Sequence, residues 1–130
     1  MNIREYLQSH TLLFDGAMGT YIAKKHPELG EASCELLNIE HPEWVGQVHR
    51  EYLEAGAVAL KTNTFAANTF FLEMAVEDIR QIIISGWEIA QKEIQAYEET
   101  HAGSRHYLFA DIGPVWVPED GDGLAIYQEI

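Results

Sequence analysis

The sequence has a single cysteine, Cys34, among 130 residues. A disulfide needs two cysteines and a structural zinc site needs several soft ligands, so this residue can build neither within the chain. Cys34 is followed by Glu-Leu-Leu-Asn. Because free cysteine is commonly a small buried hydrophobic residue, we expect a structural role for Cys34 rather than a reactive one.

Basic residues and long apolar runs are also scarce. The chain has 8 lysines and arginines against 21 aspartates and glutamates, a formal net charge of −13, and this charge repels phosphate backbones and anionic lipid headgroups. No apolar run approaches the roughly 20 residues that span a bilayer, and the N-terminus lacks a basic stretch followed by a long apolar core. We therefore predict a cytoplasmic protein that binds neither nucleic acid nor a membrane.

The composition is that of an ordinary globular domain. Hydrophobic residues make up 47% of the chain and charged residues 22%, which argues against disorder. We treat residues 1–130 as one domain.

Hydrophobic periodicity predicts three apolar strands that alternate with helices. The strands are expected at residues 11–14, 57–60 and 107–110, and the helices at 2–8, 21–25, 42–54, 76–96 and 124–130. Continuous apolar strands, rather than alternating ones, indicate βα units and a parallel sheet. A doubly wound sheet and an eightfold barrel both begin in this way, and three βα units occupy about half of the roughly 250 residues of a barrel, so the chain looks unfinished.

The two longer helices are expected to bury apolar side chains at helical spacing. In the first these are Trp44, Val45, Val48, Tyr52 and Leu53; in the second they are Ile79, Ile82, Ile83, Trp87, Ile89, Ala90 and Ile94. The chain also has six histidines, none at metal-ligand spacing with another: His10, His26, His41, His49, His101 and His106. We interpret these histidines as solvated.

Each predicted strand ends in a turn of small polar residues or glycine, at residues 15–20, 62–64 and 111–114. Tight βα turns favour such residues for conformational reasons alone. In parallel α/β folds, however, the carboxyl ends of the strands form the ligand site, so the three turns would converge on one crevice.

The first turn fits a small amino acid better than a nucleotide. It matches neither the dinucleotide fingerprint nor the P-loop. Its backbone N–H groups are unobstructed and can bind a small carboxylate, and Asp15 can face an ammonium group. An amino acid zwitterion carries both groups.

Four stretches of sequence together resemble the homocysteine S-methyltransferase family. They are LLFDGAMGT at residues 12–20, CELLN at 34–38, AGAVALKTNTFAAN at 55–68 and ADIGP at 110–114. The family includes the N-terminal barrel of methionine synthase, bacterial fusions with methylenetetrahydrofolate reductase, and betaine-dependent enzymes. The Gly-Ala-Met-Gly of the first loop is more similar to the first two branches.

The resemblance implies the first three βα units of a truncated (β/α)₈ TIM barrel that moves a methyl group onto the homocysteine sulfur to give methionine. It also implies that the substrate is bound by Asp15, Gly16, Ala17, Met18, Gly19, Thr20, Asn63, Thr64, Gly113 and Pro114. In the family, zinc binds the substrate thiol through three cysteines, one late in the barrel and an adjacent pair after it. None of these three is present here, so we expect no metal ligand and no catalytic residue in this chain. The methyl donor is open, with cobalamin and folate as possible methyl sources.

Two functions remain possible on the sequence. The first is a part of a methyltransferase that contributes part of the homocysteine pocket and is inactive alone. Its exposed strand edges and helix faces predict poor stability or self-association. The second is a non-catalytic small α/β module that binds an amino acid or regulates another protein.

Overall fold

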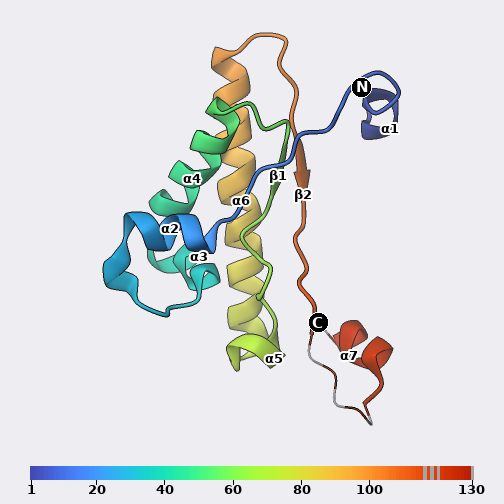
Figure 1. Ribbon diagram of the computed structural model, residues 1–130. Helices are drawn as coiled ribbons and strands as arrows, with labels where there is room; N and C mark the ends of the chain where they lie inside the picture. Colours follow the sequence, from blue (N-terminus) through green and yellow to red (C-terminus); the bar gives the residue numbers. More distant parts are fainter. Residues whose placement is uncertain (116, 118, 120, 130) are drawn as a thin grey trace.

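A short parallel sheet with helices packed on one side organises the molecule (Figure 1). The computed structural model describes residues 1–115, 117, 119 and 121–129. Strand β1 (Ala59–Lys61) pairs in parallel with β2 (Tyr107–Phe109), and Ala59 lies opposite Tyr107. Helices α4 (Pro42–Glu54) and α6 (Val76–Thr100) pack against each other beside the strands. The predicted mixed α/β class and the parallel direction of these strands are therefore confirmed.

The segment predicted as the first strand, residues 11–14, pairs only at one residue. Phe14 forms an isolated parallel bridge with Ala59. The Leu13 carbonyl accepts from the backbone N–H groups of Val58 and Ala59, and the Asp15 N–H donates to the Ala59 carbonyl. The segment thus runs beside β1 as expected. The prediction of a full strand was wrong, because too few residues pair before the chain turns at Asp15.

Short helices lie in the connections and near both ends of the chain. They are α1 (Ile3–Tyr6), α2 (Gly19–Lys25), α3 (Leu37–Glu40), α5 (Thr69–Leu72) and α7 (Gly123–Glu129), with 3₁₀ turns η1 (Pro27–Leu29) and η2 (Cys34–Leu36). A capping box begins α1, in which Asn2 and Glu5 each accept from the other's backbone N–H. The last predicted helix, residues 124–130, agrees with α7, except that Ile130 lies outside the described residues.

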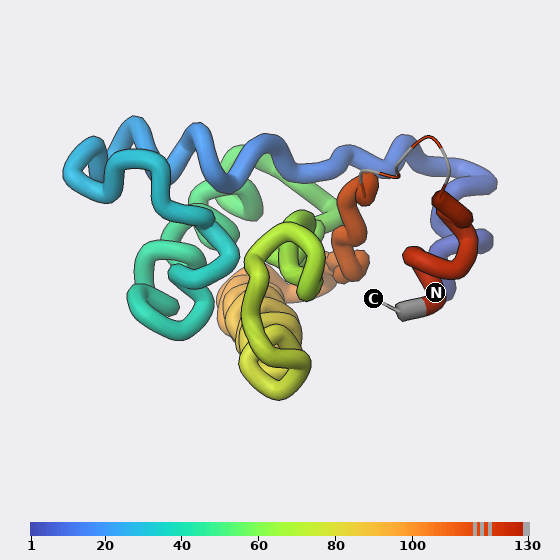
Figure 2. Tube along the Cα trace, turned by 90° about the horizontal axis from the view of Figure 1, so that it is seen from below, coloured from blue at the N-terminus to red at the C-terminus, as the bar shows by residue number. Residues whose placement is uncertain are grey.

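Helices α4 and α6 bury one stripe each, as their sequence periodicity predicts. In α4 the stripe includes Val45, Val48 and Leu53; in α6 it includes Ile79, Ile82, Ala90 and Ile94. Figure 2, viewed from below, shows α6 nearly along its axis with α3 and α4 beside it. The expected burial of Ile83 and Trp87 was wrong, since each is 40% exposed. They lie outside the stripe of α6 that packs on α3 and α4.

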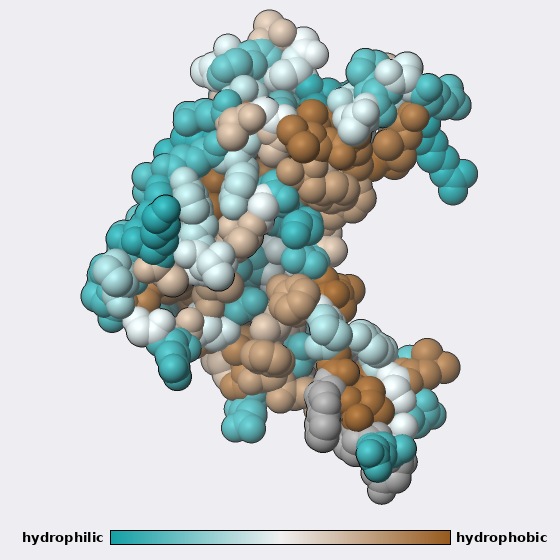
Figure 3. Space-filling view, in the orientation of Figure 1, coloured by the Kyte–Doolittle hydropathy of each residue, from teal (hydrophilic) through white to brown (hydrophobic). Residues whose placement is uncertain are grey.

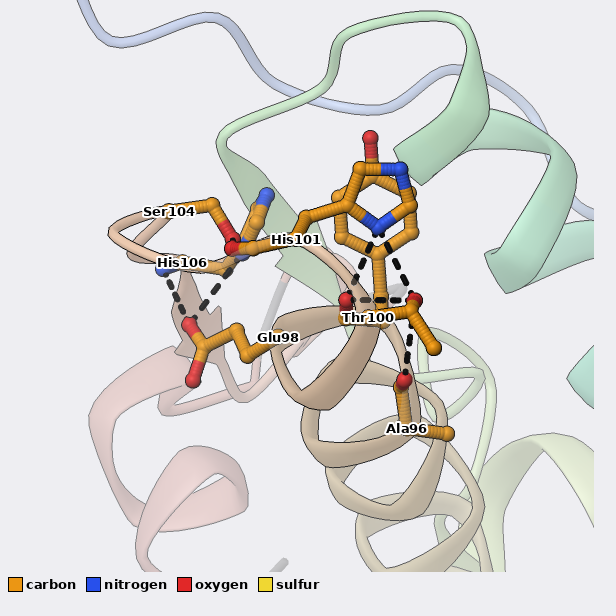
Figure 4. Close-up of polar contacts among 7 residues, drawn as sticks. Ala96, Glu98, Thr100, His101, Ser104 and His106 are labelled. Carbon is orange, nitrogen blue, oxygen red and sulfur yellow. Dashed lines mark hydrogen bonds and ion pairs between the residues drawn. The ribbon is translucent and has the colours of Figure 1, made fainter.

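The turn from α6 into β2 is held by a set of local polar contacts (Figure 4). The His101 ring stacks on Tyr97, with centroids 3.9 Å apart, and its Nδ1 lies 2.9 Å from the Tyr97 carbonyl. Ser104 Oγ donates to the His101 carbonyl, and the His106 N–H donates to Glu98 Oε1 at 2.8 Å. These contacts satisfy groups left open at the end of a helix. They lie at the N-terminal end of β2, opposite the carboxyl ends of the strands where a ligand site is expected. We therefore assign them a role in stability.

Large apolar side chains remain uncovered near the strands and on α6. Figure 3 shows apolar side chains gathered around a hollow on the strand side of the molecule. Those at least 40% exposed include Leu13, Phe14, Phe65, Phe71, Ile84 and Ile112. Among the described residues, no helix is both long and apolar enough to cross a membrane.

The interpretation of all six histidines as solvated was wrong for His106, whose side chain is 7% exposed, and for His49. Its residue surface is 0% exposed, and neither ring nitrogen has a hydrogen-bond partner in the described part of the chain. Burial lowers the pKa of His49 to about 4, because the charged imidazolium loses its hydration. Helical spacing did signal this, since His49 follows Val45 by four residues on the buried face of α4.

The pKa of His49 predicts acid-sensitive stability. The pKa of His49 is about 4 in the folded chain and 6.5 for an ordinary histidine. The contribution of neutral His49 to the free energy of unfolding is therefore fully present above pH 6.5. It falls by up to roughly 3 kcal/mol as the pH drops from 6.5 toward 4. We expect His49→Leu to remove most of this pH dependence in urea unfolding followed by circular dichroism. His10→Leu, at an exposed histidine, is the control. Equal pH dependence in the His49 variant and the wild type would contradict the prediction.

Candidate functional site

A cavity of about 460 Å³ opens where Asp15 and the carboxyl end of β1 lie side by side. Seven of the ten residues predicted to bind substrate line it: Asp15, Gly16, Ala17, Met18, Gly19, Thr20 and Asn63. The remaining lining residues are Cys34, Glu35, Lys61, Thr62, Phe65 and Asp111. The first predicted turn and the second therefore share one wall, as the parallel arrangement of strands requires.

Asp15 is fixed at this wall by the backbone of β1. Its Oδ2 accepts from the Lys61 N–H at 3.0 Å, whereas its Oδ1 is buried and has no partner within the described residues. Burial raises the pKa of the Asp15 carboxyl above its ordinary value, and the hydrogen bond from the Lys61 N–H and the Lys61 charge oppose this. A buried carboxylate oxygen without a donor is costly unless a cationic group meets it.

The loop after Asp15 is held from the side of helix α4. Tyr52 donates its hydroxyl to the Ala17 carbonyl at 2.8 Å. Gly16 lies against the same phenol, since a Cβ at this position would be 2.7 Å from the Tyr52 oxygen. Any larger residue at position 16 would require Tyr52 or the loop to shift, so glycine allows the backbone to approach the ring closely. No backbone N–H from Gly16 to Thr20 donates to a protein acceptor in the part of the chain that the structure describes.

Asn63 lines the cavity, but its side-chain amide is used within the protein. Its Nδ2 donates to the Cys34 carbonyl at 2.7 Å and to Asn38 Oδ1 at 2.9 Å, and its Oδ1 accepts from Cys34 Sγ at 3.2 Å. Asn38 in turn donates to the carbonyls of Asn63 and Ile82. The residue therefore shapes the wall through a buried network, with its polar atoms already paired.

Glu35 and Cys34 are wall residues to which the sequence reasoning assigned no site role. Glu35 is 4% exposed; its Oε1 accepts from the Ala66 N–H and its Oε2 from Ser33 Oγ. Burial, followed by the nearby Glu35 charge, raises the pKa of Cys34 to about 12, so the thiol is protonated at neutral pH. The available signal was the CELLN stretch, which forms part of the resemblance to the family but was not predicted to lie in the pocket.

Three predicted site residues lie outside this cavity wall. Thr64 lines a neighbouring cavity of about 200 Å³, and its hydroxyl donates to the Asp111 carbonyl at 2.8 Å. Gly113 is buried, and its N–H donates to the Phe65 carbonyl, so close that a Cβ would be 2.6 Å from that oxygen. Pro114 is exposed. At this point the second and third strand-end loops contact each other. The substrate-binding roles of these three residues stay predictions, as do those of the seven that line the cavity.

The sequence is similar to known methyltransferases. The family model for homocysteine S-methyltransferase matches residues 12–121. Methionine synthase from Mycobacterium leprae is 33% identical over 120 residues, and that from Mycobacterium tuberculosis is 32% identical over the same length. Each match covers 87% of this chain and 10% of the relative, so the chain spans about a tenth of these proteins.

Solved structures of a methyltransferase share the fold. The homocysteine methyltransferase MmuM from Escherichia coli matches with a TM-score of 0.73 at 24% identity in its metallated form, and 0.75 at 25% identity in its oxidized form. These matches cover 86% of this chain and 41% and 40% of those chains. Because the family model spans most of the sequence, including all three strand-end loops, the chain belongs to the homocysteine S-methyltransferase family.

Proposed function

We propose that this chain forms the first three βα units of a (β/α)₈ barrel that transfers a methyl group to homocysteine. In this proposal the remaining units belong to a longer protein, and the chain contributes one part of the homocysteine pocket. The share of the relatives that it spans, from a tenth to about two fifths, supports this view. The proposal assigns the chain a binding role and no catalytic residue of its own.

The observation that carries the proposal is the buried Oδ1 of Asp15 in the cavity wall, for which the described residues supply no hydrogen-bond donor. An ammonium group placed against this oxygen would supply the missing donor and the opposite charge. The N–H groups between Gly16 and Thr20, which have no acceptor among the described residues, lie in the same wall and suit a carboxylate. An amino acid supplies both groups at a spacing set by its single α-carbon.

The described residues do not fit the zinc that the family uses. No three of their histidine, cysteine, aspartate and glutamate side chains are grouped to hold a metal. Cys34 also donates its thiol hydrogen to Asn63, and its raised pKa keeps it protonated, whereas zinc binds the thiolate. We therefore propose that the ligand cysteines lie in the remainder of the parent protein.

Substitution of Asp15 tests the binding role. Asp15→Asn keeps an oxygen for the Lys61 N–H but removes the negative charge, so we expect L-homocysteine to bind about tenfold more weakly in a nuclear magnetic resonance titration. Wild-type binding should also fall as the pH drops through the raised pKa of Asp15, since the carboxyl then loses its charge. This pH step should be absent from the variant.

The matched control is Asp122→Asn, which removes the same charge from an exposed residue before α7. Failure of the wild-type chain to bind L-homocysteine, or equal binding by the Asp15 and Asp122 variants, would contradict the proposal.

The reactivity of Cys34 tests its exclusion as a metal ligand. With a pKa of about 12, its thiolate fraction at pH 8 is about a thousandfold below that of an ordinary thiol. We expect alkylation by iodoacetamide, followed by mass spectrometry, to be slower by a similar factor in the folded chain than in urea. A rate in the folded chain near that of free cysteine would show an ionised and available thiol.

The uncovered apolar surface predicts concentration-dependent self-association of the isolated chain. Ile84 on α6 is 42% exposed, and we expect Ile84→Glu to reduce association in analytical ultracentrifugation. Gln81→Glu adds the same charge to the same helix without removing apolar surface, and it should have less effect. A wild-type chain that stays monomeric and unfolds cooperatively at every concentration would refute this prediction.

A further inference from the structure

We infer that Tyr52 is a positioning residue of the amino acid pocket, which orients the Ala17–Met18 peptide so that the Met18 N–H faces the cavity. The inference rests on the proposed function. It adds a residue from the outer helix α4 that does not itself line the cavity among the described residues.

The contact between Tyr52 and the loop is both polar and steric. The hydroxyl donates to the Ala17 carbonyl at 2.8 Å. The ring carbons Cε1 and Cζ lie 3.1 Å from where a Cβ of residue 16 would be. The phenol therefore holds two consecutive residues of the loop, one by a hydrogen bond and one by close packing.

The ring itself is held firmly by its surroundings. Tyr52 packs against the buried cluster around Ile22 and Val48 and also against the one around Leu53 and Leu60. Its centroid is 5.7 Å from that of Tyr21. A side chain packed between two core clusters loses little further freedom when it makes a hydrogen bond. The loop peptide is thus tied to a rigid part of the fold.

The hydrogen bond from Tyr52 to the Ala17 carbonyl also fixes the direction of the Met18 N–H, because both groups belong to one planar peptide. In a planar trans peptide the C=O and the following N–H point in opposite directions. The chain has no cis peptide bond among the described residues. Because the Ala17 carbonyl points to Tyr52 on the α4 side, the Met18 N–H points away from α4, and Met18 lines the cavity.

The hydroxyl is available as a donor throughout the neutral range. Burial and the nearby Asp15 charge raise the pKa of Tyr52 above its ordinary value of 10. The phenol therefore keeps its proton at neutral pH and can donate it to the Ala17 carbonyl there. The two residues can act together, with Asp15 on the ammonium and the peptide held by Tyr52 on the carboxylate.

The test compares Tyr52→Phe, which keeps the ring and loses the hydroxyl, with Tyr107→Phe. Among the described residues, the Tyr107 hydroxyl donates only to the Met1 carbonyl. Two ligands are titrated: L-homocysteine, and aminopropanethiol, which is homocysteine without its carboxylate. We expect Tyr52→Phe to weaken binding of L-homocysteine about five- to tenfold and to leave binding of aminopropanethiol unchanged. Tyr107→Phe should change neither.

Equal binding of L-homocysteine by Tyr52→Phe and the wild type would overturn the inference. So would an equal loss for both ligands, because that is the result of damaged packing. If the wild-type chain bound neither ligand, the proposed function would fail. Backbone ¹⁵N relaxation measured without ligand then still tests the role of Tyr52. Lower backbone order parameters at Ala17 and Met18 in Tyr52→Phe would support the inference that Tyr52 fixes this peptide. Unchanged order parameters would overturn it.

Discussion

The buried amide pair of Asn38 and Asn63 joins three parts of the molecule that are distant in sequence. Asn38 follows the η2 turn, Asn63 follows β1, and the Asn38 amide also donates to the Ile82 carbonyl of α6. Each buried polar group left unpaired would cost about 1–3 kcal/mol, so the pair favours one arrangement of these segments. Gly86 of α6 allows the close approach, because a Cβ there would be 2.7 Å from Asn38 Nδ2.

This arrangement sets the shape of the cavity wall. With Asn63 turned toward residues 34–38, its polar atoms serve the network, and Cys34 and Glu35 are brought to the edge of the cavity. The polar atoms left for a ligand then come from Asp15 and the loop after it. The end of the first strand segment thus supplies hydrogen-bonding groups that have no partner among the described residues, and the end of β1 supplies the side chains that support them.

The charge distribution is consistent with this division. The chain carries a formal net charge of −13, and Asp15 and Asp111 lie in the same wall with Lys61 between them in sequence. Burial raises the pKa of Asp15, the hydrogen bond and charge of Lys61 lower it, and the charge of Asp111 raises it further. A pocket with acidic residues and free backbone N–H groups suits a zwitterion better than a simple anion.

The sequence by itself determined the family, the parallel βα order and the position of the first loop, because these depend on local patterns. The apolar runs, the glycine turns and the stretches DGAMGT and TNTF are readable without a structure. Only the tertiary structure decided which of these groups meet. The pairing of Phe14 with Ala59, the use of the Asn63 amide by Asn38, and the contact of Tyr52 with Ala17 join residues 25 to 45 positions apart. Local periodicity describes one element at a time, and it carries no information on the partner that another element brings.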